Sequence, residues 1–503
     1  MNILIFTDVN GVIGFGRYAG AYRIATELRL HGYSTQVIEF LADMTLIDFQ
    51  NICDKYIDND SLFVGFSTTL LIKKTKSNSE SRLDRSKENK HSGHLPHDND
   101  YCQQIFSIFK NKNPRLKIVL GGARTNKTNL PGVDYWFWGL ADTSIIAFAD
   151  FLKKNIPIKT HPVQYGEAIS HTDYPIHNYR TSKIIWEDND YIFENEHLPI
   201  EIDRGCIYRC AFCANPLHKR PGEYAKDPYV VYEELLYNYE KFGTTGYMFC
   251  DDTFNDSNEK VKVYHQLFQK LPFKLEWTGY GRVDCIATHE EQIELLLESG
   301  VRAILFGIET FSPYTTKYVG KGLQPEKMKD TLYRIKEKWG NEVIITGSFI
   351  IGLPEESEDS IWSTVEWLKR KDCPLDDVIF SPLNIRTLSD NPNAPLSRIA
   401  KNPLKYGYKM SPIQTGTGIS SDGPQWENQF MNKKHAETLA RDIQQLFTLE
   451  KPIADWAVYS RMRSIGYSHE ELTSNELKKT FSLVEANRRR EILRNNYMNK
   501  LIK

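Results

Sequence analysis

The sequence predicts an α/β protein built from two parallel-sheet units and a mainly helical C-terminal region. Short apolar segments alternate with segments of helical spacing along most of the chain, a pattern typical of parallel sheets covered by helices. At 503 residues the chain exceeds the size of a common single domain, so two or three packed units are expected. Its 41% hydrophobic and 25% charged residues are sufficient for ordinary buried cores.

The first unit is expected to be a Rossmann-like parallel sheet over residues 1–155. It opens with a strand, a helix and a strand, predicted by NILIFTD, AYRIATELRLHG and TQVIEF. Further short strands are predicted by SLFVGFSTT, LKIVLGGA and DYWFWG. The loops of such a sheet gather at the carboxyl ends of its strands. Residues 72–100 are polar and lack periodicity, and we expect a mobile surface insertion there.

The second unit is expected after a connector over residues 156–197, where several prolines interrupt any regular element. Six apolar segments then recur between residues 198 and 386: PIEID, YMFC, LEWTGY, AILFGIE, IITGSFIIG and DVIFSPL. Helical segments between them predict a partial (β/α)6 barrel of the TIM type, with its active site at the carboxyl ends of the strands. Loops and helices follow over residues 387–503 and predict a helical C-terminal domain.

Bulk properties exclude several classes of protein. The formal net charge of −2 and the pI of about 6.7 give no overall positive field, so binding to nucleic acid is not expected. No apolar run approaches the roughly 18–20 residues that cross a bilayer. The opening MNILIFTD lacks a basic leader and reaches Asp8 at once, which favours a first strand over a signal peptide. We therefore expect a cytoplasmic protein with no membrane partner.

Three of the eight cysteines form one group directly after the first predicted barrel strand. Cys206, Cys210 and Cys213 have the spacing C-x3-C-x2-C. Zinc is one candidate for such a group, but structural zinc sites have four ligands and usually a second ligand pair, which does not follow here. Iron-sulfur cubanes are held by thiolates, usually four. Three thiolates leave one iron open to a substrate or cosubstrate, so the spacing favours an iron-sulfur cluster.

The cysteines and the segments around them resemble the radical S-adenosylmethionine (SAM) superfamily. The resemblance covers about residues 196–386 and rests on LPIEIDRGCIYRCAFC, YMFCDDTFND, EWTGYGRVD, ILFGIET with GKG after it, and GSFIIGLPEES, in the family's order. It implies that the three cysteines hold a 4Fe-4S cluster. It also implies that the open iron takes the amino and carboxylate groups of SAM, and that reductive cleavage of SAM yields a 5'-deoxyadenosyl radical.

The same resemblance implies two contacts to the adenine of SAM. Phe212, just before the third cysteine, matches the aromatic residue that packs near adenine in the family. A plain core aromatic is the alternative. Gly352 lies in the segment that resembles the family's glycine-bearing fifth strand, although the first glycine of that segment is displaced by one position. A close approach of backbone to adenine would explain Gly352, and a loop turn would explain it equally well.

Polar residues at three further predicted strand ends are expected to hold the rest of SAM. Asp251 and Asp252 end the second barrel strand, where the family binds the methionyl amino group, although the small residues usual in that motif are absent. Arg282 would pair with a carboxylate after the third strand. Glu309 would accept hydrogen bonds from the ribose hydroxyls or the amino group after the fourth. Salt bridges at the barrel rim are the alternative for the last two.

The N-terminal sheet resembles the cobalamin-binding domain of cobalamin-dependent radical enzymes. The resemblance lies in its size, its place before the cysteines and its GFSTT and LGGART loops. It implies that Ser67, Thr68, Gly121 and Gly122 lie near the corrin, where small residues allow a flat macrocycle to approach backbone. The Asp-x-His-x-x-Gly loop that would ligate cobalt from below has no match here; the corresponding region reads TDVNGVIGFG.

These resemblances imply a transferase that uses radical SAM chemistry for cobalamin-dependent methylation of an unactivated atom. The alternative is a cobalamin-independent radical SAM enzyme that catalyses rearrangement, dehydrogenation or sulfur insertion and uses the N-terminal unit to bind substrate or a partner. A third hypothesis is an iron-sulfur scaffold or redox sensor without catalysis. The enzyme hypotheses imply a small-molecule or peptide substrate and an external electron donor of the flavodoxin or ferredoxin type.

Overall fold

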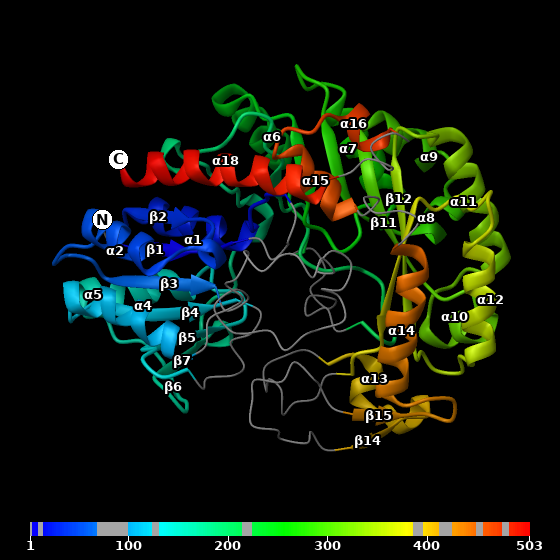
Figure 1. Cartoon of the computed structure of the whole chain (residues 1–503), viewed down its shortest axis with the longest axis horizontal. Coiled ribbons are helices and arrows are strands. Elements are labelled where there is room, and N and C mark those ends of the chain that lie inside the picture. The colour runs from blue at the N-terminus through cyan, green and yellow to red at the C-terminus, as the bar shows by residue number, and fades with distance from the viewer. Residues whose placement is uncertain are drawn as a thin grey trace.

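The computed structural model describes residues 3–8, 14–67, 99–122, 130–213, 224–385, 396–411, 425–448, 456–474 and 482–503. Two parallel sheets, one from each predicted unit, form the two halves of the molecule (Figure 1). Helices surround both sheets, and the predicted fold class is confirmed. None of the described helices combines the length and the apolar character needed to cross a membrane.

The N-terminal sheet has the strand order β2-β1-β3-β4-β5-β7-β6. Its strands are β1 (Ile3–Phe6), β2 (Thr35–Ile38), β3 (Phe63–Ser67), β4 (Lys117–Gly121), β5 (Tyr135–Trp138), β6 (His161–Pro162) and β7 (Glu167–Ser170). Every pair is parallel except β6 with β7. Because the chain reverses its strand order at β1, the carboxyl ends of β1 and β3 flank a topological switch point, where ligands of open α/β sheets bind.

Helices cover both faces of this sheet, and its strands are therefore buried runs of β-branched and aromatic residues. Alternate strand residues such as Phe6 and Ile3 belong to different core clusters on the two faces. The helices are α1 (Ala19–Leu30), the short η1 (Leu41–Asp43), α2 (Leu46–Tyr56), α4 (Asn99–Lys112) and α5 (Ser144–Lys154). A capping box between Thr45 and Asp48 fixes the start of α2.

The segment expected to be a connector differs from the prediction, because it extends the sheet. Strands β6 and β7 lie inside residues 156–197 and pair at the edge of the N-terminal sheet. The rest of the segment contains short 3-10 turns, η3 (His171–Asp173), η4 (Tyr179–Thr181) and η5 (Asp188–Asp190). The prolines do limit regular structure here, since the two strands have two and four residues.

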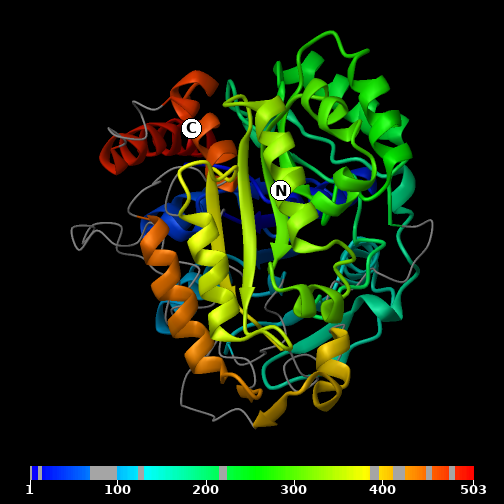
Figure 2. The same cartoon turned by 90° about the vertical axis from the view of Figure 1, so that its right-hand side faces the viewer.

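The second sheet has six parallel strands in the order of the sequence, β8 to β13. They are β8 (Leu198–Ile200), β9 (Gly246–Phe249), β10 (Glu276–Gly281), β11 (Val301–Glu309), β12 (Ile344–Ile351) and β13 (Asp377–Pro382). The first and last strands do not pair, so the barrel is partial as predicted. Figure 2 shows the long strands of this sheet with helices packed outside them.

The helices between these strands are α6 (Pro228–Phe242), α7 (Asn258–Phe268), α8 (Val283–Thr288), α9 (Gln292–Glu298), α10 (Pro313–Val319), α11 (Pro325–Trp339) and α12 (Glu358–Leu368). Local signals set their ends. Helix α6 begins with the Asp227 side chain accepting a hydrogen bond from Tyr229 N–H, has Pro228 at its first position and ends at Gly243 with a φ of 71°.

The C-terminal region connects the two halves. Its elements are α13 (Arg398–Lys401), η6 (Pro403–Tyr406), β14 (Lys409–Ser411), β15 (Gln425–Glu427), α14 (Lys433–Thr448), α15 (Trp456–Arg463), α16 (His469–Thr473) and α18 (Leu483–Ile502). Helix α18 runs along the N-terminal unit (Figure 1). One core cluster contains Tyr497 of α18, Tyr459 of α15, Leu4 of the first sheet and Leu305 of the barrel. The two units therefore share part of one hydrophobic core.

Candidate functional site

The cysteine loop, residues 203–213, follows β8 at the carboxyl end of the barrel sheet. Cys206 and Cys210 are buried, and Cys213 is half-buried. The loop is held from two sides, because Ala211 N–H donates to the Val319 carbonyl at 2.9 Å and the Ala211 carbonyl accepts from Ile399 N–H at 3.0 Å. These bonds fix the loop between the end of α10 and the start of the C-terminal region.

Polar groups face two of the three sulfur atoms. Cys206 Sγ lies 3.5 Å from Thr253 Oγ1, and Arg282 Nη1 donates to Cys210 Sγ at 3.4 Å. A cation and a hydroxyl beside the sulfurs suit thiolates, which carry negative charge in a cluster. The three residues therefore fit the thiolate set of an iron-sulfur cluster with one open iron.

The described residues contain no group of three His, Cys, Asp or Glu side chains arranged to hold one metal ion. Ligands of a single ion converge on one point. The thiolates of a cubane each bind a different iron and are spread over the faces of the cluster.

The Arg282 side chain is held by contacts with other residues of this chain. Its side chain is 6% exposed, its Nε donates to Asp284 Oδ1 at 2.9 Å, and its guanidinium lies 3.8 Å from the ring centroid of Tyr208. Burial alone would lower the pKa of Arg282, but the hydrogen bond and charge of Asp284 outweigh it, so the pKa is raised and the guanidinium stays charged. The role of Arg282 toward the carboxylate of SAM stays a prediction.

Asp251 ties the ends of β8 and β9 together. Its Oδ1 accepts from Ile202 N–H at 2.9 Å and from Asp203 N–H at 3.1 Å, at the start of the cysteine loop. Burial raises the pKa of Asp251 to about 6, against the lowering effect of Lys260. Asp252, by contrast, is exposed. Contact of either aspartate with the methionyl amino group stays a prediction.

Sequence reasoning missed Lys260, which stands among buried carboxylates beside the cysteine loop. Its Nζ donates to Asp203 and lies 3.3 Å from Asp256 Oδ1. The neighbouring Asp203 is 2% exposed, and burial raises the pKa of its carboxyl well above the usual range. The contact of Lys260 with Asp203 spans 57 residues, so the sequence carries no local sign of it.

Glu309 has a strained backbone at the end of β11. It is buried, has a φ of 72°, and stands where the register of β11 with β12 shifts. Its Oε1 lies 3.6 Å from Lys321 Nζ. Burial raises the pKa of Glu309 although Lys321 lowers it. A non-glycine residue in this conformation is uncommon and clusters at functional sites, which is consistent with the predicted role in binding SAM.

The two residues predicted to lie near adenine both pack against other residues of this chain. Phe212 is half-buried and packs against the main core cluster. Gly352 has a φ of 91°, and a Cβ there would lie 2.4 Å from Trp426 Cη2. Packing of Trp426 thus accounts for the glycine, and contact of either residue with adenine stays a prediction.

At the N-terminal sheet, small residues end two neighbouring strands. Ser67 of β3 stands opposite Gly121 of β4, and Gly122 follows with a φ of 110°. Thr68 lies outside the described residues. Small groups on adjacent strand ends leave room for a broad, flat ligand to approach the backbone, so these residues fit the corrin predicted there.

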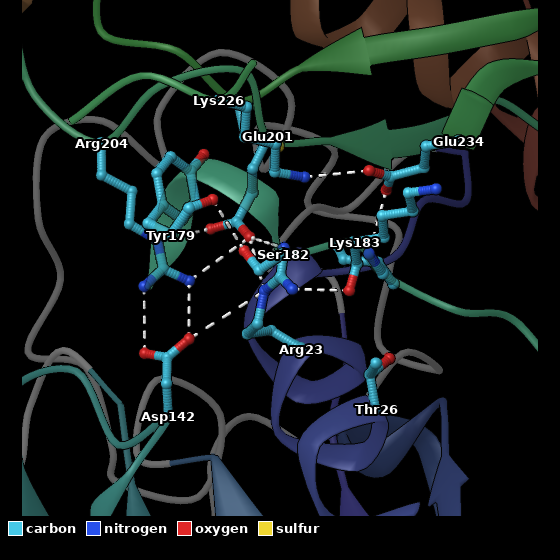
Figure 3. A network of polar contacts seen from close by, with 12 residues as sticks. Arg23, Thr26, Asp142, Tyr179, Ser182, Lys183, Glu201, Arg204, Lys226 and Glu234 are labelled. Atoms are coloured by element: carbon cyan, nitrogen blue, oxygen red, sulfur yellow. Dashed lines mark hydrogen bonds and ion pairs between the residues drawn. The ribbon is translucent and has the colours of Figure 1, made fainter. Parts of the chain in front are cut away.

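A network of buried and partly buried charges joins this edge of the N-terminal sheet to the cysteine loop (Figure 3). Arg204, two residues before Cys206, donates to both carboxylate oxygens of Asp142 at 3.0 Å each. Arg23 of α1 donates to Glu201 Oε2 at 2.9 and 3.0 Å. Because Asp142 follows β5 and Glu201 follows β8, the carboxyl ends of both sheets meet at this junction.

Comparison with known proteins identifies relatives of the barrel unit. The family model "Radical SAM superfamily" matches residues 200–368. A protein of Pyrococcus horikoshii named an uncharacterized methyltransferase is 29% identical over 169 residues, which are 34% of this chain and 36% of that protein. The match thus spans about a third of the length of this curated relative.

Two solved structures share the fold over most of the chain. The radical SAM methyltransferase TsrM from Kitasatospora setae superposes with a TM-score of 0.59 at 14% identity, covering 84% of this chain and 80% of that one. The cobalamin-dependent SAM radical enzyme OxsB gives 0.53 at 13% identity, covering 81% and 56%. At such identities the likeness shows the fold alone. Residues 200–368, which include the three cysteines, are thus similar to the radical SAM superfamily, and the chain shares the fold of these two structures.

Proposed function

We propose that the chain is a radical SAM transferase that methylates an unactivated atom of a small-molecule or peptide substrate with the help of cobalamin. One observation carries the proposal. The cysteine loop and the carboxyl edge of the N-terminal sheet meet at one junction, through the bidentate pair of Arg204 with Asp142. A cofactor on that edge would therefore face the mouth of the barrel.

When bound, the cluster and SAM supply a 5'-deoxyadenosyl radical, and cobalamin supplies a methyl group. The chain supplies the rest. Cys206, Cys210 and Cys213 hold the iron. Arg282 donates a hydrogen bond to Cys210 Sγ, and the Thr253 hydroxyl lies beside Cys206 Sγ. Glu309 and Asp251 orient SAM from the strand ends. The packed junction keeps water from the reacting centre.

The solved neighbours support the choice of cobalamin. One TsrM structure contains cobalamin and a 4Fe-4S cluster, and one OxsB structure contains aqua-cobalamin and SAM. Both resemble this chain across the N-terminal sheet and the barrel, since each covers more than four fifths of the chain. We propose an external electron donor of the flavodoxin or ferredoxin type for the reductive step.

The test is anaerobic reconstitution of the full chain. We expect about four irons, formation of 5'-deoxyadenosine from SAM and dithionite, and one equivalent of bound hydroxocobalamin. The triple variant with Cys206, Cys210 and Cys213 changed to alanine should lose iron, whereas Cys53→Ala and Cys373→Ala should keep it. Hydroxocobalamin well below one equivalent, or unaffected by Gly121→Trp, would favour the cobalamin-independent alternative.

A further inference from the structure

A pocket of about 240 Å³ lies where the two units meet. The loop after β5, with Leu140 and Asp142, forms one wall, and residues 171–179 after β7 form another. Arg204 and Tyr224 line it from the barrel side. The pocket thus adjoins the cysteine loop. It is smaller than the roughly 300–1,000 Å³ of sites for drug-sized ligands, so it suits one small organic group.

Two phenol groups of this pocket have no hydrogen-bond acceptor among the described residues. Tyr179 is 4% exposed, and its hydroxyl makes no hydrogen bond. The buried hydroxyl of Tyr174 faces the backbone N–H of Lys159, which is itself a donor. Nε2 of His177 also lacks a hydrogen bond and lies 3.5 Å from Glu27 Oε1. Buried donors without acceptors weaken a fold, and two phenol hydroxyls around one pocket indicate a ligand that supplies the acceptor.

The charged groups at the pocket are already paired with one another (Figure 3). Arg204 donates to both oxygens of Asp142 and, through Nε, to Glu201 at 3.1 Å. Arg23 also donates two hydrogen bonds to Glu201. Two guanidinium groups thus face two carboxylates, and no net charge remains to attract a phosphate. Burial raises the pKa of the Tyr174 and Tyr179 phenols, which stay protonated donors at neutral pH.

We propose that this pocket binds an uncharged carboxamide group of the substrate. Its carbonyl oxygen accepts from the hydroxyls of Tyr174 and Tyr179, and the imidazole of His177, which pairs with Glu27, lines the pocket beside it. The apolar part of the substrate packs against Leu140 and Ile176, which line the same pocket. The inference rests on the proposed function and gives its substrate class, a peptide or an amide-bearing small molecule anchored beside the cysteine loop.

The probe is N-acetyl-L-leucinamide, titrated by calorimetry into the cluster-loaded full chain. We expect saturable binding, with weaker binding of N-acetyl-L-leucine, whose carboxylate meets no unpaired cation. Tyr179→Phe should weaken binding of the amide about threefold to tenfold, as for one lost hydrogen bond, and the double variant with Tyr174→Phe should weaken it further. Because the Tyr179 hydroxyl has no acceptor in the described part of the chain, Tyr179→Phe should not lower the unfolding temperature of the ligand-free protein.

Tyr264→Phe is the matched control. Its hydroxyl is equally buried and has no hydrogen-bond partner among the described residues, but Tyr264 lies on α7, in the core of the barrel unit. This variant should bind the amide like the wild type. Absent binding of the amide, tighter binding of the carboxylate, or full binding by the double variant would overturn the inference. SAM cleavage is measured on the same samples: cleavage without amide binding counts against the pocket alone, and amide binding without cleavage counts against the proposed function alone.

Discussion

Arg282 is the residue with the most direct chemical connection to the cluster site. Asp284 holds two of its nitrogens and Tyr208 stacks on its guanidinium, so that Nη1 is left directed at Cys210 Sγ. A charged N–H donor at a cluster thiolate stabilises the reduced cluster, which is the more negative state. Arg282 should therefore raise the reduction potential of the cluster.

We predict that Arg282→Gln lowers the midpoint potential of the reconstituted cluster while iron content stays normal. Asp284→Asn should raise the potential, because it leaves the guanidinium charge uncompensated. Redox titration followed by electron paramagnetic resonance checks both variants. If Arg282→Gln leaves the potential unchanged, the contact with Cys210 is not kept in the loaded protein.

SAM affinity, measured on the same variant, tests the other predicted role of Arg282. A charge-assisted hydrogen bond to SAM predicts that Arg282→Gln weakens SAM binding about tenfold or more.

The cysteine group could be predicted from the sequence because all three ligands lie within eight positions. The partners of their sulfurs could not. Thr253 is 47 residues from Cys206, and Arg282 is 72 residues from Cys210. Such contacts depend on the pairing of strands, which leaves no local signature. The sequence assigns Arg282 to SAM because it ends a strand, and only the packing reveals its contact with Cys210.

Among the elements, the turn after β12 provides a test of why Gly352 is a glycine. Its φ of 91° and the 2.4 Å that would separate an added Cβ from Trp426 both disfavour a side chain. We predict that Gly352→Ala lowers the free energy of unfolding by about 3 kcal/mol, from backbone strain and overpacking. Urea unfolding without SAM measures this. Trp426→Phe should partly rescue the variant, and full stability of Gly352→Ala would instead favour a glycine kept for adenine.

Helix α15 docks on the barrel through His197, the residue before β8. Its Nδ1 lies 3.1 Å from Ser460 Oγ, and its ring occupies the space that a Cβ on Gly246 would fill. Burial, with help from the charge of Arg463, lowers the pKa of His197 to about 3. The imidazole is therefore neutral in the folded protein at every pH at which the enzyme would work.

This depressed pKa predicts how stability depends on pH. The unfolded chain takes up a proton on His197 near pH 6.5, whereas the folded chain does so only near pH 3. The contribution of His197 is thus complete above about pH 6.5 and is lost as the pH falls, by about 1.4 kcal/mol per pH unit. We predict that His197→Gln flattens the pH dependence of the unfolding midpoint between pH 7 and 5.5, while His289→Gln, an exposed control, keeps the wild-type slope. Equal slopes in all three proteins would contradict the prediction.

The strands and helices of both sheets could largely be predicted, because apolar alternation and helical spacing are local properties. Strands β6 and β7 could not be predicted. With two and four residues, they lack a visible pattern, and β7 forms only because its backbone pairs with β5. The prolines around them correctly indicate an irregular segment, but not that the segment completes the sheet edge beside the pocket.

At the scale of the whole molecule, the relation between the two units depends on buried ion pairs. Arg17, before α1, donates to both oxygens of Glu196, just before β8, at 2.5 and 3.1 Å. Neither side chain is exposed. Arg17 Nη1 also donates to the Asp190 carbonyl at 2.9 Å. No local pattern indicates this pairing across 179 residues, yet it links the first unit to the strand that carries the cysteine loop.

Removing one partner of such a pair leaves an uncompensated buried charge, which costs about 3–5 kcal/mol. We therefore predict that Arg17→Met and Glu196→Met each unfold at clearly lower denaturant concentration than the wild type. The double variant should recover part of the loss, because two apolar side chains replace two paired charges. Because Glu196 leads directly into β8 and the cysteine loop, the single variants should also retain less cluster after anaerobic reconstitution. Unfolding followed by circular dichroism checks the stability, and the iron content of the same samples checks the cluster. If the loss of unfolding free energy in the double variant equals the sum of the losses in the single variants, the two residues act independently and the prediction is wrong.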